Sequence, residues 1–153
     1  MPEARLARPD DLDGVIALFQ ASEVSAVVGP RERAAHVWER ILSREGVAVF
    51  VSEIDGAVVA TCMLITVPNL LRSGRQHGFL ENVVTHPEHR GRGHGHAVVA
   101  AALDEAWRQD CHHVLLQSGR TDPRVRRFYE SCGFRSDVRT AYVAQRSQDL
   151  CHP

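Results

Sequence analysis

The strongest signal in the chain lies in residues 81–95, which read Glu81-Asn82-Val83-Val84-Thr85-His86-Pro87-Glu88-His89-Arg90-Gly91-Arg92-Gly93-His94-Gly95. The β-rich segment Gly78–Val84 predicts a strand, and Pro87 ends it because proline has no backbone N–H to donate. Three glycines at alternating positions then precede a helix rich in alanine and valine. Glycines let the backbone approach a ligand, and a helix N-terminus favours anions. The loop therefore predicts a site for an anionic group such as pyrophosphate.

Three kinds of phosphate loop compete for this segment. A Walker-type loop needs a lysine, and the chain contains none. A dinucleotide fingerprint needs Gly-x-Gly-x-x-Gly in an early βαβ unit, whereas this chain has Gly-x-Gly-x-Gly past its middle. The third pattern, Arg-x-x-Gly-x-Gly, is satisfied by Arg90, Gly93 and Gly95. It resembles the pyrophosphate loop of the GNAT superfamily of acyl-CoA-dependent N-acyltransferases.

A second block supports the same resemblance. It reads Asp122-Pro123-Arg124-Val125-Arg126-Arg127-Phe128-Tyr129-Glu130-Ser131-Cys132-Gly133-Phe134. It resembles the late helix of that family, which ends in a Phe-Tyr-Glu-x-x-Gly-Phe signature whose tyrosine lies beside the CoA sulfur. With the flanking elements, the resemblance covers nearly the whole chain and implies the fold and acetyl-CoA as cosubstrate. It does not identify the acceptor.

Length and composition fit one domain. The 153 residues predict a single domain over residues 1–146 with a frayed tail at 147–153. The net charge of −1 gives no reason to expect nucleic acid or an anionic membrane as partner. We find neither a long apolar segment nor a signal peptide, and the four cysteines form no Cys-x-x-Cys pair, so we expect free thiols and a cytoplasmic protein.

Hydrophobic spacing and turn signals predict alternating elements. Strands are expected at Ala4–Ala7, Val47–Ile54, Ala57–Val67, Gly78–Val84 and His112–Gln117, with a final strand or strand pair at Phe134–Gln145. Helices are expected from Pro9 to Gln20, Arg31–Arg44, Gly95–Gln109 and Asp122–Ser131. Asp55-Gly56 is a strong hairpin signal. Polar loops or connectors occupy Ser22–Pro30 and Pro68–His77.

This order, β-α-α-β-β-β-α-β-α-β, predicts an α/β fold with a mixed sheet and helices on both faces. The resemblance implies that the fourth and fifth strands run parallel but splay apart and admit the pantetheine arm of CoA. It also implies that Val83, Val84 and Thr85 offer backbone groups to that arm.

The chemistry of acyl transfer indicates which residue types are needed. An alkyl amine has a pKa near 10.4, so a base must take a proton before or as it attacks. We assign that role, direct or through a water, to Glu81, and assign polarisation of the thioester to a backbone N–H near Val83. The resemblance implies that Tyr129 protonates the departing CoA thiolate and that the amine attacks directly in a ternary complex. The alternatives are a structural carboxylate at Glu81 and simple packing of Tyr129 against CoA.

The resemblance also implies a wider set of CoA contacts. The family often has asparagine at the position of Asp122, and an ionised aspartate cannot donate as an amide does. The expected cofactor-binding residues are Val83, Val84, Thr85, Arg90, Gly91, Arg92, Gly93, His94, Gly95, His96, Asp122, Arg124 and Tyr129. Four histidines between His86 and His96 raise the possibility of a metal, but their spacing lacks the i, i+4 helical pair of zinc enzymes, so we expect none.

The prediction of the acceptor rests on a more local similarity. The segments Glu81–Val84 and Cys111–Leu115 resemble strands of glucosamine-6-phosphate N-acetyltransferases, and Arg72 and Arg75 could then meet an anionic substrate group. We expect N-acetyl transfer to a primary amine of a small molecule. The alternatives are a protein or peptide acetyltransferase and a non-catalytic acyl-CoA sensor. The apolar residues 141–144 allow a homodimer through the final strands.

Overall fold

A computed structural model of the chain describes residues 1–22 and 28–147. By backbone contacts the chain divides into two compact units, Met1–Leu116 and Gln117–Pro153. The first unit contains β1 (Arg5–Leu6), η1 (Pro9–Asp11), α1 (Leu12–Ala21), α2 (Arg31–Ser43), β2 (Val47–Ile54), β3 (Ala57–Val67), η2 (Arg72–Gly74), β4 (Gln76–Thr85), η3 (Pro87–His89), α3 (His94–Arg108) and β5 (Cys111–Leu115). The second unit contains α4 (Pro123–Ser131).

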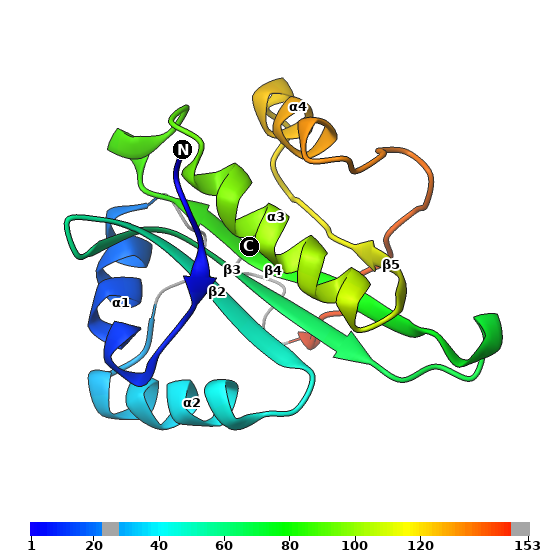
Figure 1. Cartoon of the computed structure of the whole chain (residues 1–153), viewed down its shortest axis with the longest axis horizontal. Helices are drawn as coiled ribbons and strands as arrows, with labels where there is room; N and C mark the ends of the chain where they lie inside the picture. The colour runs from blue at the N-terminus through cyan, green and yellow to red at the C-terminus, as the bar shows by residue number, and fades with distance from the viewer. Residues whose placement is uncertain (23–27, 148–153) are drawn as a thin grey trace. The chain divides into compact units, whose positions relative to one another are not determined.

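The five strands form one sheet in the order β1-β2-β3-β4-β5 (Figure 1). The first four strands pair antiparallel, while β4 and β5 run parallel. The connection from β4 to β5 passes through α3, as a parallel pair requires. The sequence-based expectation of an α/β fold with a mixed sheet and parallel fourth and fifth strands is therefore confirmed.

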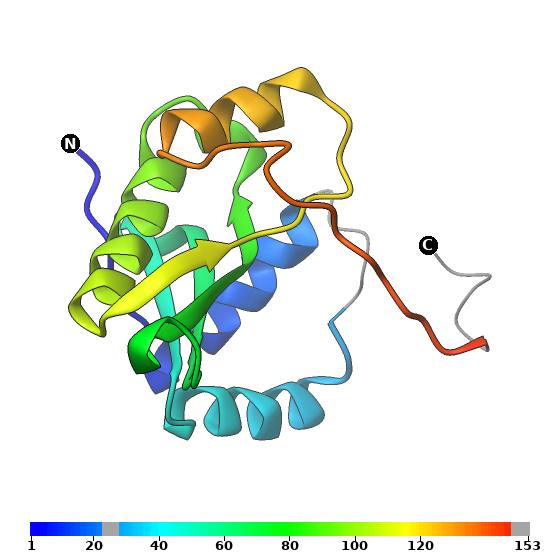
Figure 2. The same cartoon turned by 90° about the vertical axis from the view of Figure 1, so that its right-hand side faces the viewer.

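Helices cover both faces of this sheet. On one face, α1 and α2 pack against the side chains of Val49, Val51 and Met63. On the other face lies α3, and the Cys62 thiol of β3 donates to the Val98 carbonyl of this helix at 3.2 Å. Since successive strand residues point to opposite faces, β3 contributes its odd-numbered residues from Thr61 to Ile65 to the α1/α2 face. Figures 1 and 2 show these layers in the first unit.

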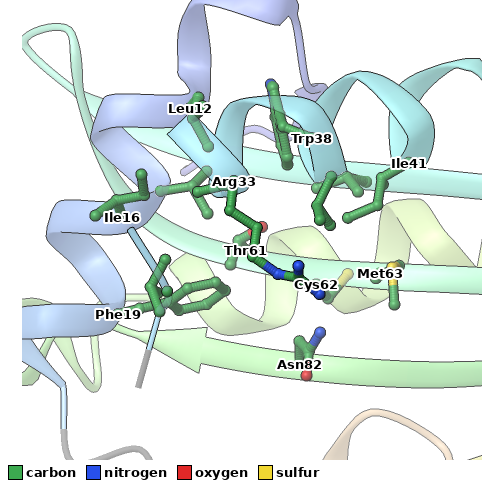
Figure 3. A pocket seen from close by; sticks show the side chains of 16 residues that line it. Leu12, Ile16, Phe19, Arg33, Trp38, Ile41, Thr61, Cys62, Met63 and Asn82 are labelled. Carbon is green, nitrogen blue, oxygen red and sulfur yellow. The ribbon is translucent and has the colours of Figure 1, made fainter. Parts of the chain in front are cut away.

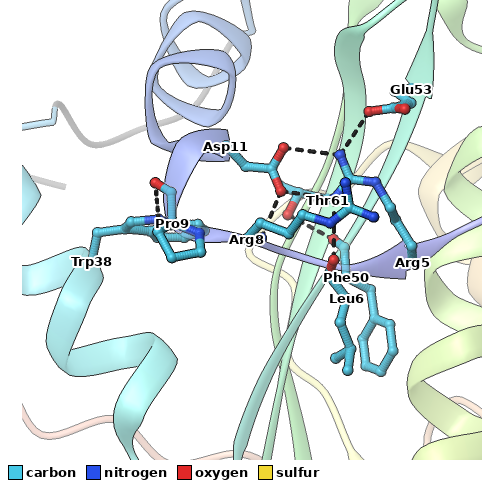
Figure 4. Close-up of polar contacts among 9 residues, drawn as sticks. All are labelled: Arg5, Leu6, Arg8, Pro9, Asp11, Trp38, Phe50, Glu53 and Thr61. Carbon is cyan, nitrogen blue, oxygen red and sulfur yellow. Dashed lines mark hydrogen bonds and ion pairs between the residues drawn. The ribbon is translucent and has the colours of Figure 1, made fainter.

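A partly buried ion-pair network fixes the start of α1 (Figure 4). The Arg5 guanidinium donates to both carboxylate oxygens of Asp11, at 2.8 and 3.0 Å, and to Glu53 at 2.7 Å. The Asp11 carboxylate also accepts the backbone N–H of Arg8 at 2.7 Å. These donors stabilise the charged form and hold the pKa of Asp11 below its usual range, with hydrogen bonding from Arg5 as the largest cause. The network ties β1 and β2 to the helix that begins at Leu12.

Most predicted elements lie within two residues of their expected bounds, but one does not form. Residues 134–147 contain no strand, so the final strand expected at Phe134–Gln145 is wrong. A strand is stable only when a neighbour satisfies its backbone groups, and the side chains of Val138 and Tyr142 are exposed rather than packed on a sheet. The single domain expected over residues 1–146 stays a prediction beside the two units. The connector at Ser22–Pro30 and the tail at 147–153 lie largely outside the described residues. In the part of the chain that the structure describes, every helix is too short or too polar to cross a membrane.

Candidate active site

The glycine-rich loop forms the N-terminus of α3, as predicted. Gly91 and Gly93 have φ angles of +73° and +93°, a region that side-chain-bearing residues rarely adopt. Gly93 is the N-cap, and the N–H groups of His94 and Gly95 at the first turn have no acceptor within the helix. Arg90 and Arg92 are both exposed at this loop. Free N–H groups, the positive end of a helix and two cations together suit a diphosphate.

A buried hydrogen bond anchors this loop to the sheet. His94 is 6% exposed, and its Nδ1 lies 2.8 Å from the Ser52 hydroxyl of β2. Burial is the largest cause that lowers the pKa of His94, and the nearby charges of His89 and Arg92 lower it further. Burial of His94 therefore favours the neutral imidazole. His94 serves to hold the first turn of α3 against β2.

A β-bulge interrupts β4 at Asn82. Met63 pairs with Glu81 and Thr61 pairs with Val84, so two residues of β4 lie opposite Cys62 alone. Asn82 takes a left-handed conformation with φ of +52°. Asparagine tolerates this conformation better than most residues, and bulges redirect the backbone near active sites. The bulge lies beside Val83, whose backbone N–H we expected to polarise the thioester.

Strand β4 has an open edge beyond the bulge. Its pairing with β5 covers Gln76–Phe79 against Cys111–Leu115, whereas β4 itself continues to Thr85. Among the described strands, no neighbour pairs with the β5 side of β4 after Phe79. Val83, Val84 and Thr85 lie on this edge, where an extended ligand can pair with backbone groups as an added strand does.

Glu81 lies on the face of the sheet that α1 and α2 cover. It is directly paired with Met63, and paired residues on neighbouring strands share a face. The Glu81 side chain is exposed, so its carboxylate is available to a ligand or a water. Its place next to the bulge brings a potential base close to the open edge of β4.

A cavity of about 220 Å³ lies between α1, α2 and the same face of the sheet (Figure 3). Met63, the partner of Glu81, lines it, and so does Asn82. The bulge brings Asn82 to this face, since an unbulged strand would place it on the α3 face with Leu80. Sequence reasoning missed this cavity, because its walls come from elements far apart in the chain.

Tyr129 is held by the C-terminal cap of α4, in the second unit. Gly133 has a φ of +97°, its N–H bonds to the Glu130 carbonyl at 3.0 Å, and the Phe134 N–H bonds to the Tyr129 carbonyl at 3.1 Å. This is a Schellman motif, in which the residue after glycine packs on the residue five positions before it. The Tyr129 and Phe134 rings make that contact, with centroids 6.1 Å apart. The Tyr-Glu-x-x-Gly-Phe signature thus has a local structural cause.

Asp122 caps the other end of α4. Its carboxylate accepts the backbone N–H of Arg124 at 2.9 Å and forms an ion pair with the Arg124 guanidinium at 3.0 Å. The hydrogen bond from the Arg124 guanidinium is the largest cause that holds the pKa of Asp122 below its usual value. Asp122 and Arg124 therefore bind each other, and the expected contact of each with CoA stays a prediction.

Arg72 and Arg75 lie near the start of β4. Arg75 forms an ion pair with Asp110 at 3.0 Å and donates to the Cys111 carbonyl, while Arg72 lies 3.4 Å from the His112 Nε2. Glu81 is six residues further along the strand, roughly 20 Å at 3.3 Å per residue. This separation gives no support to contact between either arginine and an acceptor held at Glu81. Their substrate-binding role stays a prediction.

The described thiols are poor nucleophiles in this fold. Burial raises the pKa of Cys62 to about 12, and burial is also the main cause that raises the pKa of Cys111 and Cys132. Cys151 lies outside the described residues. These environments agree with direct attack by the amine.

The clustered histidines contact one another without forming a ligand set. The ring centroids of His86 and His89 lie 5.3 Å apart, and those of His89 and His94 lie 6.4 Å apart. Within residues 1–22 and 28–147, no three His, Cys, Asp or Glu side chains are arranged to hold a metal ion.

Comparison with known proteins agrees with this geometry. The model of the acetyltransferase (GNAT) family matches residues 14–134. The structure of a putative acetyltransferase from Agrobacterium tumefaciens str. C58 is 40% identical, with a TM-score of 0.86 over 94% of this chain and 99% of that one. An uncharacterized N-acetyltransferase of Archaeoglobus fulgidus is 32% identical over 133 residues, 84% of this chain and 90% of its own.

A glucosamine 6-phosphate N-acetyltransferase from Trypanosoma brucei brucei is 33% identical over 91 residues. This chain spans 60% of the length of that relative, and the shared segment is 60% of this chain. The family model, by contrast, extends from α1 to the residue after the α4 cap. The chain therefore belongs to the GNAT family and is an acetyltransferase.

Proposed function

We propose that this acetyltransferase moves the acetyl group of acetyl-CoA to the primary amine of a small molecule. The observation that carries the proposal is the juxtaposition in the first unit. The anion-binding loop at the start of α3, the open edge of β4 and the exposed Glu81 carboxylate follow one another along a single stretch of chain. The loop suits the diphosphate of CoA, and the open edge suits its pantetheine arm.

The proposed reaction proceeds in one ternary complex. The neutral amine attacks the thioester carbonyl, and a backbone N–H near Val83 stabilises the negative charge that develops on the carbonyl oxygen. Glu81 accepts the proton lost by the amine, directly or through a water. The new C–N bond forms as the C–S bond breaks, and Tyr129 donates a proton to the departing CoA thiolate. The products are an N-acetyl amide and free CoA.

We also propose that the protein is located in the cytoplasm. Free thiols in described residues favour a reducing compartment such as the cytoplasm. A homodimer stays a prediction, and its expected strand at Phe134–Gln145 is not formed in this chain.

The test is a thiol-release assay with acetyl-CoA and a panel of amines. The panel contains amino sugars and their phosphates, polyamines, aminoglycosides, amino acids and lysine peptides. It includes glucosamine 6-phosphate because of the trypanosomal relative. We expect thiol release with at least one small amine and binding of acetyl-CoA in calorimetry. Binding of acetyl-CoA without turnover of any amine would contradict the proposal and favour a sensing module.

A further inference from the structure

The cavity under α1 and α2 has the properties of a specific acceptor pocket. Resting on the proposed function, we propose that the acceptor is a primary amine with an apolar body about as large as an aromatic ring and with one anionic group. An aromatic amino acid is the simplest compound of this kind. The cavity binds the apolar body, Arg33 binds the anionic group, and Glu81 faces the amine.

The walls of the cavity are almost wholly apolar (Figure 3). Of the hydrophobic side chains that line it, four belong to α1, four to α2 and two to the sheet: Leu12, Val15, Ile16, Phe19, Ala34, Val37, Trp38, Ile41, Val49 and Met63. Two of the polar side chains among the walls, those of Trp38 and Thr61, already have hydrogen-bond partners. The Trp38 indole donates to the Pro9 carbonyl at 3.2 Å, and the Thr61 hydroxyl donates to the Phe50 carbonyl at 2.9 Å. A ligand body that needs several hydrogen bonds would lose them here.

The size of the cavity limits the body that it can take. Its volume is about 220 Å³. An apolar cavity of roughly 150 Å³ is enough to bind benzene. The space therefore fits one aromatic ring with a short chain.

Two polar side chains enter the cavity, and they set its charge preference. Figure 3 shows Arg33 reaching from α2 across the cavity towards the sheet, with Asn82 below it on β4. Arg33 forms no ion pair with any described residue. A guanidinium is suited to bidentate binding of a carboxylate, and it repels a second cation. Polyamines are thus disfavoured by charge, and sugar phosphates by the apolar walls.

The amine end of such a ligand would lie towards Glu81. Met63 lines the cavity and is paired directly with Glu81 across β3 and β4. Paired side chains on one face have Cβ atoms about 5 Å apart, so the Glu81 carboxylate stands at the border of the cavity. The bulge places Asn82 and the open edge of β4 at the same border.

The first experiment measures kcat/KM with L-phenylalanine, phenethylamine, glucosamine 6-phosphate and spermidine. We expect the two aromatic amines to exceed the other two, and L-phenylalanine to exceed phenethylamine. Arg33→Gln should lower kcat/KM for L-phenylalanine by about tenfold through its KM and leave phenethylamine nearly unchanged, because phenethylamine has no carboxylate. Arg40→Gln is the matched control, since Arg40 is exposed on α2 and does not line the cavity.

The second experiment reports binding without turnover. In the Trp107→Phe background, Trp38 becomes the single tryptophan and reports on the cavity that it lines. With CoA present, L-phenylalanine should change its fluorescence, and Ala34→Phe, which fills the cavity, should abolish that change.

The two experiments separate the two proposals. Ligand-dependent fluorescence without thiol release supports this pocket and contradicts the proposed acetyl transfer. Thiol release with glucosamine 6-phosphate or spermidine, but not with aromatic amines, supports acetyl transfer and overturns this pocket. Absence of both signals with the aromatic amines also overturns it.

Discussion

The Ser52 hydroxyl and the His94 Nδ1 lie 2.8 Å apart in the buried layer between β2 and the first turn of α3. Ser52 is 1% exposed, so neither group can turn to solvent if its partner is lost. The bond joins the central sheet to the loop that we propose for the diphosphate of CoA. It therefore couples the packing of the core to the geometry of the anion site.

Ser52→Ala should destabilise the fold by about 1–3 kcal/mol, because it leaves a buried imidazole nitrogen without a partner. It should also weaken acetyl-CoA binding, since the first turn of α3 loses its anchor. Chemical denaturation and calorimetry would measure the two effects. Ser43→Ala is the control, because Ser43 is exposed at the end of α2. Equal effects of the two substitutions would show that the Ser52–His94 bond anchors nothing.

Asp11→Asn should destabilise the fold by about 2 kcal/mol at neutral pH, in the range of hydrogen bonds to charged groups. Arg5 lowers the pKa of Asp11 in the folded state, so the unfolded chain binds its proton more readily. The charged Asp11 carboxylate stabilises the fold fully above its ordinary pKa of about 3.9. This stabilisation is lost as the pH falls through the lower pKa that Asp11 has in the folded state. Chemical denaturation of the parent protein and of Asp11→Asn, from neutral to acid pH, measures this effect. The difference between their free energies of unfolding should shrink in acid.

The control for that measurement is Asp13→Asn. Asp13 pairs with Arg31 at 2.7 Å, but both side chains are exposed. Exposed ion pairs contribute little to stability, so this variant should remain close to the parent protein at every pH. A difference for Asp11→Asn that stays constant down to strong acid would contradict the assignment.

Local signals in the sequence predicted much of this fold. Asp55-Gly56 favours a two-residue hairpin with positive φ at both positions, and the structure has +49° and +80° there. The flanking strands Val47–Ile54 and Ala57–Val67 have the predicted bounds. The glycines of the loop were likewise predictable, because positive φ excludes most other residues.

The features that the sequence did not reveal depend on tertiary contacts. The bulge at Asn82 has no glycine to mark it, and Ser52 reads as an ordinary strand residue. Arg33 reads as one charge on a polar helix face, and its place over the cavity depends on how α2 packs on the sheet. The expected final strand failed for a related reason. Residues 134–145 have a strand-like composition, but a strand also needs a neighbour.

Gly93→Asp should weaken acetyl-CoA binding by at least about tenfold. The substitution strains a residue at φ of +93° and places a negative charge where we propose a diphosphate. Gly74→Asp is the matched control, because Gly74 has a φ of +78° and open space around it, before β4 begins. Both variants should lose stability in thermal denaturation, and Gly93→Asp alone should lose affinity in calorimetry. Unchanged affinity would remove the loop from the proposed CoA site.

Tyr129→Phe should lower kcat by about 100-fold with little change in acetyl-CoA affinity, as expected for loss of a general acid. The ring contact with Phe134 does not involve the hydroxyl, so the α4 cap should persist. The chain has one other tyrosine, Tyr142, which is exposed and provides the matched control Tyr142→Phe. Steady-state kinetics on both variants decides the matter. An unaltered kcat in Tyr129→Phe would assign the residue to packing.

Glu81→Gln should depress kcat/KM most at the low-pH side of the activity profile. There the amine is mostly protonated, and removal of its proton limits the reaction. At high pH the amine is already neutral, so the variant should approach the activity of the parent protein. Glu39→Gln, an exposed residue on α2, supplies the control for loss of one carboxylate. Profiles of kcat/KM against pH would be compared for the three proteins. A loss of equal size at every pH would mean that Glu81 supports the bulged strand and takes no proton, because a structural defect does not depend on the protonation of the amine.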